Sequence, residues 1–302
     1  MSQQEFPPLS GEQVAHFLKH GHLVIHDCFP RAFAEDWTAN AFRRLEYDPG
    51  DPSTWQQEVV HMPSAQRVPM PEIAPKAWQA ACALLGGEER VSPCAWGDSM
   101  IVNLRKGADQ PWQPPSASVG GWHKDGDFFR HFLDSPEQGL LTIVIWSDIE
   151  PQGGGTFAAG DSVAPVARLL AAHPEGVLPS GAPGASFGSL INQCQDFVEL
   201  TGKIGDVVLI HPFLLHASSQ NHSGKARFIT NPPISLKEPM QFDRADPADF
   251  SPVERAVLLG LDVDCLDFQP AAPRERIVSE GMKRKQKMLE EEQARLAATA
   301  SH

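Results

Sequence analysis

Three residues able to bind one metal ion are prominent in the sequence: His123 and Asp125, one residue apart, and the distant His216. If the first two lie on a β-strand, their side chains point to the same face, because strand side chains alternate with a period of two. Two imidazoles and a carboxylate on one side of a metal leave its other positions open. Non-haem Fe(II) oxygenases use this 2-His-1-carboxylate set, and their open positions receive a co-substrate and O₂. The set therefore predicts an iron site at which O₂ reacts.

A planar cation follows the second histidine: Arg227 lies eleven residues after His216. A guanidinium grips a carboxylate through two parallel hydrogen bonds. Residues 220–225 form a polar turn, so Arg227 is expected to begin a strand that returns beside the one ending at His216. There it would reach the carboxylate of a metal-bound co-substrate. Together with the three ligands, it indicates an enzyme that uses iron and a 2-oxoacid.

Other interpretations of these residues remain open. His-x-Asp is common by chance, and alone it indicates a surface pair in a polar loop. His211 competes with His216, but histidines five apart on an unbroken strand face opposite sides, so only one can reach the metal. The polar turn and the arginine after His216 favour it, and His211 is predicted to be packed and hydrogen-bonded. The same ligands also suit Zn²⁺ or iron in hydrolysis or in an oxidation without a 2-oxoacid, with Arg227 structural. A third alternative is a catalytically silent β-barrel binding protein.

The composition is that of a globular protein with an acidic surface. Of 302 residues, 41% are hydrophobic and 21% charged, close to the usual values. The net charge of −13 disfavours contact with the phosphates of nucleic acids. Five scattered cysteines without a CxxC pair are typical of free thiols in a reducing compartment. No secretion signal or long apolar run is visible. We therefore expect a soluble, cytoplasmic protein without nucleic-acid or membrane partners.

The N-terminal part of the chain has helical patterns. Ser10 and Gln13 form a capping box that opens a helix, and Gly21 ends it. A short strand and two further helices are expected at residues 23–25, 31–45 and 73–85. Residues 47–72 are rich in Pro, Asp and Ser and are predicted to be loop.

The pattern changes near Ser99, where short apolar runs separated by Gly, Pro and Asp begin. Such runs predict an all-β sandwich or barrel. The expected strands are 99–104, 141–146, 155–157, 207–210 and 228–230. A short helix is expected at 165–170. The Pro/Gly/Ser-rich residues 174–188 are predicted to be a mobile loop and a candidate active-site lid, and residues 279–299 a solvated C-terminal helix.

The segment HASSQNHSGKAR resembles the distal motif of the phytanoyl-CoA hydroxylase-like (PhyH) family of Fe(II)/2-oxoglutarate dioxygenases. That motif runs His-x-Ser-x-x-Asn-x-Ser, with an arginine eleven residues after the histidine. The positions that match are His216, Ser218, Asn221, Ser223 and Arg227. The HxD pair, the strand that contains Trp146 and the opening helix and strand also agree, so the resemblance spans about residues 9 to 235.

The resemblance implies a fold that is mainly β with flanking helices, built on a double-stranded β-helix (jelly-roll, cupin-like) core. We expect a single dioxygenase domain over residues 1–302. Within it, residues 1–98 would be a mostly helical part packed on the barrel, residues 99–235 the β-helix core, and residues 236–302 a C-terminal helical extension.

The resemblance also implies that His123, Asp125 and His216 bind Fe(II) and that the far carboxylate of 2-oxoglutarate pairs with Arg227 and Ser218. The implied reaction is hydroxylation or desaturation of a small organic substrate by O₂, with decarboxylation of 2-oxoglutarate to succinate. Further implied contacts to the co-substrate are Trp146, Met100, Thr156 and Asn103. Core packing is the alternative for the tryptophan and the methionine, and a departure from the family's Pro-Gly-Ser-His turn weakens the assignment of the threonine.

The substrate is not identified by the sequence. Phe128, Phe129 and Arg130 come directly after the HxD pair, and they are expected, with Trp122, to line the substrate pocket. An apolar substrate with an anionic group would suit them. Equally, the phenylalanines could pack the barrel while Arg130 is solvated.

Overall fold

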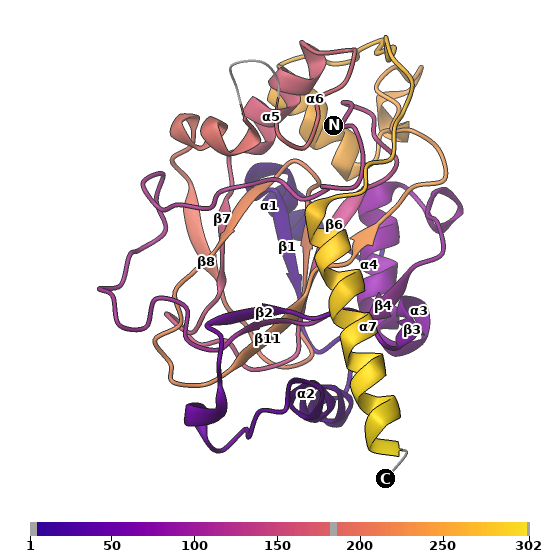
Figure 1. The fold of residues 1–302 in the computed structure, drawn as a ribbon. Helices are drawn as coiled ribbons and strands as arrows, with labels where there is room; N and C mark the ends of the chain where they lie inside the picture. The colour runs from indigo at the N-terminus through magenta and orange to yellow at the C-terminus, as the bar shows by residue number, and fades with distance from the viewer. Residues whose placement is uncertain (1–4, 182–185, 301–302) are drawn as a thin grey trace.

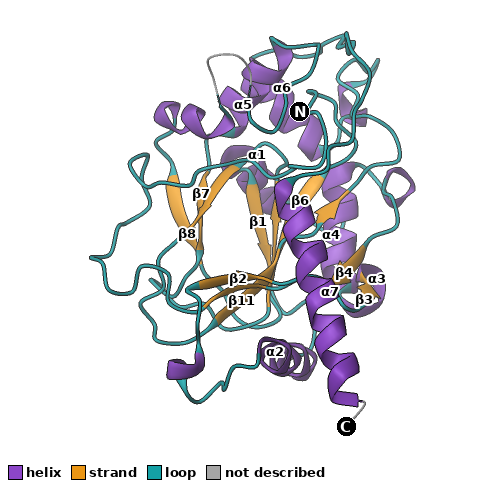
Figure 2. Ribbon diagram, in the orientation of Figure 1, coloured by secondary structure: helices purple, strands orange, loops and turns teal. Residues whose placement is uncertain are grey.

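The computed structural model describes residues 5–181 and 186–300. Its centre consists of antiparallel β-sheets, and helices flank them (Figures 1 and 2). The strands are β1 (His22–Ile25), β2 (Val59–His61), β3 (Arg67–Pro69), β4 (Ala95–Gly97), β5 (Ile101–Asn103), β6 (Leu140–Ile145), β7 (Thr156–Ala159), β8 (Phe197–Leu200), β9 (Val207–Ile210), β10 (Leu215–Ser218), β11 (Arg227–Thr230) and β12 (Pro233–Ile234). The helices are α1 (Gly11–His20), α2 (Arg31–Leu45), α3 (Met70–Ile73), α4 (Pro75–Leu85), α5 (Val163–Ala171), α6 (Pro252–Leu261) and α7 (Glu280–Ala300). The expectation of a β-rich protein with flanking helices is confirmed.

Two sheets carry the residues of interest. The larger has the order β1-β9-β6-β11-β5-β2, with β12 also paired to β6, and the smaller has the order β10-β7-β8. Strands β6 and β9 lie inside the larger sheet, and every residue of both is buried. This explains their unbroken apolar sequence, because a strand covered on both faces has no solvent side to show as alternation.

Helices α1 and α2 have the bounds that their sequences predict. Ser10 caps α1 in a capping box with Gln13, and Gly21 ends it in the left-handed region at φ 65°, a conformation that glycine adopts without a Cβ clash. Helix α2 packs aromatic side chains against the sheet. The ring of Trp37 stacks on that of Trp146, with 4.8 Å between centroids.

The prediction of a loop over residues 47–72 is wrong in part. Strands β2 and β3 form within it, and α3 begins at Met70. Strand β2 pairs with β5 at the edge of the larger sheet, Val59 opposite Asn103 and His61 opposite Ile101. Three residues give too short a pattern to indicate a strand, but they suffice once a neighbouring strand supplies the hydrogen bonds.

The expected loop over residues 174–188 includes residues 182–185, which lie outside the described part of the chain. Among its described residues, Val177 exchanges two backbone hydrogen bonds with His131, both 2.8 Å long. A 3-10 helix begins at Phe187, whose side chain is buried. The described residues of this loop are therefore tied to the body of the protein on both sides of the gap.

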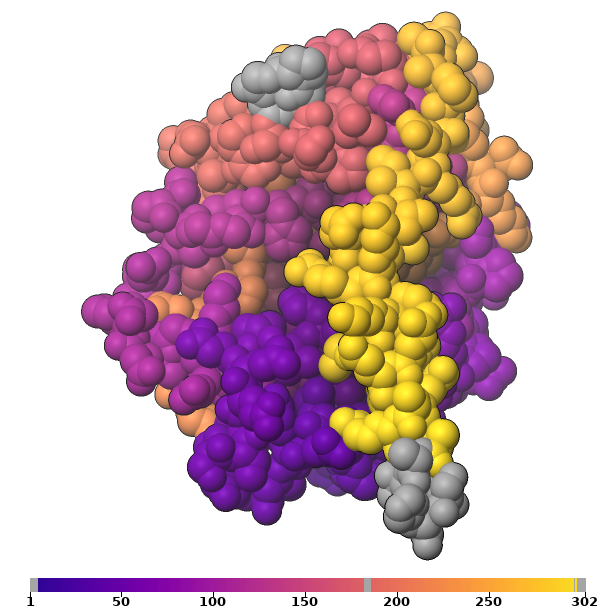
Figure 3. All heavy atoms as spheres, in the orientation of Figure 1, coloured from indigo at the N-terminus to yellow at the C-terminus, as the bar shows by residue number. Residues whose placement is uncertain are grey.

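Helix α7 crosses one face of the molecule and ends near α2 (Figures 1 and 3). The helix itself was expected, but its description as solvated is wrong for one face, on which Met288 packs against the core and the Glu292 side chain is only 10% exposed. A sequence rich in Lys, Arg and Glu has no apolar stripe that would reveal this contact. Within the described residues, no helix combines the length and the apolar character needed to cross a membrane.

Candidate metal and anion site

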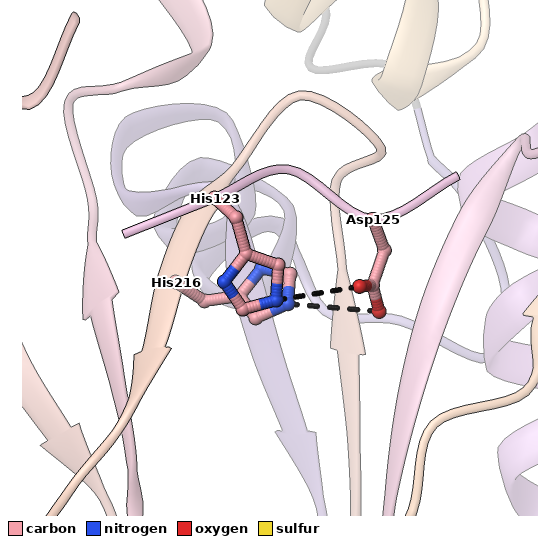
Figure 4. Close-up of side chains that lie close together, drawn as sticks. All are labelled: His123, Asp125 and His216. Carbon is pink, nitrogen blue, oxygen red and sulfur yellow. Dashed lines mark ion pairs between the residues drawn. The ribbon is translucent and has the colours of Figure 1, made fainter. Parts of the chain in front are cut away.

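The side chains of His123, Asp125 and His216 converge (Figure 4). Each offers one ligand atom, and these atoms all lie within 4.8 Å of one another. The Nε2 atom of His123 is 3.4 Å from Oδ1 of Asp125, and Nε2 of His216 is 3.6 Å from Oδ2. Two imidazole nitrogens and a carboxylate oxygen in this arrangement fit the facial set used for Fe(II), with the remaining positions open.

Two segments far apart in sequence bring the histidines together. His216 lies on β10, while His123 forms an isolated bridge with it. The two residues exchange backbone hydrogen bonds of 3.0 and 2.9 Å. Asp125 lies in a bend after this bridge, so the expectation that His123 and Asp125 share a regular strand is wrong. The bend at Asp125 still turns its carboxylate toward the two imidazoles.

Backbone carbonyl groups fix the orientation of both imidazoles. Nδ1 of His123 donates to the carbonyl oxygen of Gly121 at 2.8 Å, and Nδ1 of His216 donates to that of Leu214 at 3.1 Å. With the proton on Nδ1, each Nε2 keeps its lone pair for a metal, and the ring is held in place. This outer shell of hydrogen bonds is typical of a metal site.

Asp125 has a further partner that the sequence did not reveal. The side-chain amide of Asn231 donates to its Oδ2 at 2.6 Å. Burial raises the pKa of Asp125, but the charge of His216 and the hydrogen bonds that both histidines can donate from Nε2 when no metal is bound outweigh it and lower the pKa well below its usual value. The ligand is therefore a carboxylate, as metal binding requires.

Arg227 and Ser218 leave polar atoms without partners in the same cavity. The arginine is 2% exposed, and its Nη1 donates to the carbonyl oxygen of Ile101 at 3.1 Å. Its Nε, together with Oγ of Ser218, is buried and has no hydrogen-bond partner among the described residues. Each such orphan costs about 1–3 kcal/mol. Burial lowers the pKa of Arg227 to about 10, which leaves it charged at neutral pH. A carboxylate would satisfy both groups.

A second cation, Lys106, lies beside this corner. Its Nζ donates to the carbonyl oxygen of Ser218 at 2.6 Å. Burial and the charge of Arg227 lower its pKa. No sequence pattern indicates this residue, because it precedes a loop and belongs to no motif. It adds positive charge where the unpartnered groups already favour an anion.

Apart from Lys106, these groups line a cavity of about 700 Å³ between the two sheets, a volume typical of small-molecule sites, which run to roughly 300–1,000 Å³. The metal set, Arg227 and Ser218 lie on its wall, and α7 covers part of it. The larger sheet supplies an apolar wall that consists of Ile101, Leu141, Ile143 and Ile229.

Of the four further co-substrate contacts expected from the sequence, the structure places one on this wall, Thr156, which lies opposite Ser218 across β7 and β10. Trp146 is fully buried against Trp37 and donates from Nε1 to Oγ1 of Thr230. Met100 is likewise buried in the core, away from the cavity lining. Core packing, the alternative considered for both residues, describes their surroundings.

Asn103 lies opposite Arg227 across β5 and β11, yet its side chain is fully buried and does not line the cavity. Its amide donates to the carbonyl oxygen of Ser219, and its Oδ1 accepts from the backbone N–H of Lys106. It therefore holds in place the end of β10, which carries Ser218, and the segment that carries Lys106.

The expected substrate-binding residues lie off the cavity. Phe129 is fully buried, and the backbone of Arg130 donates to Glu275, with which its side chain also pairs at 2.8 Å. Trp122 is buried and donates to the carbonyl oxygen of Ser116, and Phe128, half-buried, accepts from the backbone N–H of Ile277. None of the four lines the cavity. The aromatic side chains are wholly or partly buried in the protein. Phe128 and Arg130 contact the segment before α7 rather than the cavity in which a ligand was expected.

His211 is separate from the site. Its Nε2 donates to the carbonyl oxygen of Val253 at 3.2 Å, and its Nδ1 accepts from the backbone N–H of Phe213. The prediction of a packed, hydrogen-bonded histidine is confirmed by these contacts.

The fold shows some similarity to solved structures. They include the non-heme alpha ketoglutarate dependent carbocyclase SnoK from nogalamycin biosynthesis (16% identity, 78% of this chain and 87% of that chain covered, TM-score 0.43). HygX from Streptomyces hygroscopicus with nickel and 2-oxoglutarate bound is similar at 18% identity, with 76% of this chain and 88% of that chain covered and a TM-score of 0.42. EctD from S. alaskensis with 2-oxoglutarate and 5-hydroxyectoine is similar at 19% identity, with 76% of each chain covered and a TM-score of 0.41.

No curated protein matches the sequence significantly. Residues 189–229 match the model of the phytanoyl-CoA dioxygenase (PhyH) family. This stretch includes β10, the first three residues of β11 and the turn between the two strands. The resemblance noted in the sequence is thereby confirmed for the segment that carries His216, Ser218 and Arg227, which matches the model of the phytanoyl-CoA dioxygenase family.

Proposed function

We propose that this protein is an Fe(II)- and 2-oxoglutarate-dependent dioxygenase that hydroxylates or desaturates a small organic substrate. The observation that carries the proposal is the set of residues that lines one cavity. It holds a His-Asp-His set and, beside it, a buried arginine Nε and a serine Oγ without partners. The first fits a ferrous ion, and the second fits the carboxylate of a co-substrate bound to that ion.

Each residue has a distinct task in this proposal. His123, Asp125 and His216 would hold Fe(II), while Arg227 and Ser218 would bind the far carboxylate of 2-oxoglutarate. When bound, the iron supplies the oxidative decarboxylation of 2-oxoglutarate by O₂ to succinate and CO₂, coupled to oxidation of a substrate C–H bond. The carbonyl groups of Gly121 and Leu214 keep both imidazoles in the ligating tautomer.

The finer architecture belongs to the same proposal. A double-stranded β-helix core is supported by two antiparallel sheets with the cavity between them. We assign the whole chain to one dioxygenase domain, with the core in residues 99–235 and β1 and β2 extending the larger sheet from the N-terminal part. A cytoplasmic location without nucleic-acid or membrane partners is supported by the five free cysteines and the acidic charge.

The test is succinate formation by the purified protein. Succinate should appear only when Fe(II), 2-oxoglutarate and O₂ are all present. Asp125→Ala should abolish it, because the metal loses its only carboxylate ligand. Arg227→Ala should weaken 2-oxoglutarate binding roughly 10–100-fold, the range for loss of a charge-assisted pair, while metal affinity is retained.

Two results would contradict the proposal. Substantial succinate from Asp125→Ala would reject the ligand assignment, and unchanged affinity for 2-oxoglutarate in Arg227→Ala would remove the arginine from the site. Binding of metal without any turnover of 2-oxoglutarate would instead favour the metal-dependent enzyme without a 2-oxoacid, or the silent binding protein.

A further inference from the structure

Helix α7 presents one face to the cavity. Its residues Gly281, Met282, Arg284, Lys285 and Met288 line the cavity. This spacing places them on one side of a helix, because residues three and four apart lie on the same face. In Figure 3 the surface is hollowed beside the N-terminal half of α7.

The basic residues of α7 differ in their partners. On the outer side, Lys283 pairs with Glu280 at 2.6 Å and Lys287 pairs with Glu291 at 3.6 Å. Arg284 and Lys285, which line the cavity, form no hydrogen bond or ion pair with any residue that the structure describes. Within two turns of helix, each outward cation has an ion pair, whereas Arg284 only lies within electrostatic reach of Glu280 and Lys285 has no ion pair with a described residue.

Arg284 and Lys285 line the same cavity as the metal set and Arg227. His61 on β2 also lines the cavity. Burial, then the charges of Lys285, Arg227 and Arg284, lower its pKa, while Asp125 raises it. The two cations of α7 therefore face the cavity that contains the metal set, on a protein whose formal net charge is −13.

The acids that line the cavity do not balance the charges of Arg284 and Lys285. Among the acids that line the cavity, Asp125 belongs to the metal set and Asp127 lies near Gly281, where it forms no ion pair with a described cation. Arg227 is assigned to 2-oxoglutarate. Arg284 and Lys285 thus have one acid between them, and a ligand with a negative group would supply the missing charge.

Apolar side chains line the cavity both on α7 and on the larger sheet. Met282 is 46% exposed, although it is a large apolar side chain. Met288 is partly buried, and Ile143 and Ile229 lie on the opposing sheet. Methionine adapts its shape to a varied apolar surface. These apolar side chains therefore lie on the wall of the same cavity as the metal set and the two cations.

We propose that Arg284 and Lys285 bind the anionic head group of the substrate, a small molecule with a phosphate or carboxylate on an apolar stem. Met282 and Met288 contact the stem. The proposal rests on the proposed function, because it takes the metal and 2-oxoglutarate to occupy the end of the cavity at His216 and Arg227. It makes α7 the element that determines substrate specificity.

The test uses octyl phosphate and octanoate as anionic probes and 1-octanol as their neutral counterpart. Each is titrated calorimetrically into the full-length protein loaded anaerobically with Fe(II) and 2-oxoglutarate. A prior titration with 2-oxoglutarate alone tests the proposed function separately. The variant Arg284→Ala/Lys285→Ala is compared with Lys283→Ala/Lys287→Ala, which removes the same charge from the outer side of the same helix. Thermal unfolding checks that both variants fold.

The expected result is that an anionic probe binds at least about tenfold more tightly than 1-octanol. This preference is lost in Arg284→Ala/Lys285→Ala and kept in Lys283→Ala/Lys287→Ala. The tighter of the two anionic probes identifies the head group. Equal affinity for charged and neutral probes, no probe binding to the wild type, or equal losses in both variants would overturn the proposal. A tenfold loss of 2-oxoglutarate affinity in Arg284→Ala/Lys285→Ala would also overturn it, by assigning these cations to the co-substrate.

Discussion

At the scale of single residues, Asn231 is the closest support of the metal set. It follows β11, and Arg227, Ile229 and Asn231 all line the cavity, as a period of two along a strand requires. Its amide holds Oδ2 of Asp125 at 2.6 Å. This hydrogen bond holds the carboxylate in the orientation in which Oδ1 faces His123 and Oδ2 faces His216.

Asn231→Ala should lower the affinity for Fe(II) about 10–100-fold, the usual effect of removing an outer-shell partner. The affinity is measured by anaerobic titration, and Thr230→Ser, next to it on β11, serves as the control. Metal affinity equal to that of the wild type would show that Asp125 is oriented without this amide.

The sequence predicted these residues to different extents. The spacing from His216 to Arg227 indicated a turn and a strand that begins at Arg227, and the structure has both. The expectation that this strand returns beside the strand of His216 is wrong, because β10 pairs with β7 in the smaller sheet whereas β11 pairs with β5 and β6 in the larger one. The position of Asn231 on the cavity wall could have been predicted, because side chains alternate along a strand and Asn231 lies four residues after Arg227. The surroundings of Trp146 were not, because its contacts with α2 depend on how a distant helix packs. Lys106 was hidden for a similar reason, since only the fold brings it to Ser218.

At the scale of elements, the position of α7 depends on contacts at both of its ends. Before it, Ile277 donates from its backbone to the carbonyl oxygen of Phe128 at 2.8 Å. Farther along, Arg44 of α2 holds Glu292 through two hydrogen bonds of 2.7 and 3.0 Å and also pairs with Asp98. The side chains of Arg44 and Glu292 are 8% and 10% exposed, so solvent screens this pair little.

Glu292→Ala should loosen α7 while the sheets remain folded. The variant leaves the buried Arg44 with Asp98 and the carbonyl oxygen of Pro63, and it removes one of the links between α7 and α2, while Arg295 of α7 keeps its hydrogen bond to the backbone of Arg44. We expect faster amide hydrogen exchange throughout α7, with exchange in β6 and β9 unchanged. The matched control is Glu291→Ala, since Glu291 is an exposed neighbour that pairs only with Lys287 on the same helix. Equal exchange in the two variants would exclude Arg44–Glu292 as the anchor.

At this scale, the sequence predicted the bounds of individual elements but not the distant elements with which they pair. The bounds of α2 and β9 follow from their own residues and agree with the structure. Strand β2 depends on β5, and the inward face of α7 depends on Arg44, which lies near the other end of the chain. A short or highly charged segment contains too little apolar periodicity to identify a partner that distant.

At the scale of the whole molecule, charge is distributed unevenly. The chain has a net charge of −13, yet the cavity gathers Arg227, Arg284 and Lys285 against Asp125 and Asp127. A locally positive cavity on an acidic protein attracts small anions, while the surface repels polyanions. The composition disfavoured nucleic acid as a partner, but only the fold shows where the opposite charge is concentrated.

The stability of the molecule should depend on pH through His211, which joins the end of β9 to α6. Its imidazole is 1% exposed and accepts from Phe213 while donating to Val253. These contacts require the neutral ring. Burial lowers the pKa of His211 to about 3, whereas in the unfolded chain it is about 6.5. Between these values the unfolded state binds the extra proton, so stability is complete above about pH 6.5 and is lost as the pH falls toward 3.

His211→Asn should remove this part of the pH dependence, because asparagine keeps an acceptor near Phe213 and does not titrate. From pH 6 to pH 5, the free energy of unfolding of the wild type should fall by about 1 kcal/mol more than that of the variant. Urea unfolding of the metal-free proteins at both values measures the difference. The variant is expected to be less stable at pH 7 through its lost contact with Val253, so the slope rather than the absolute stability is the test. Parallel slopes would mean that His211 takes up its proton equally in the folded and unfolded states, which burial of a neutral ring between β9 and α6 does not permit.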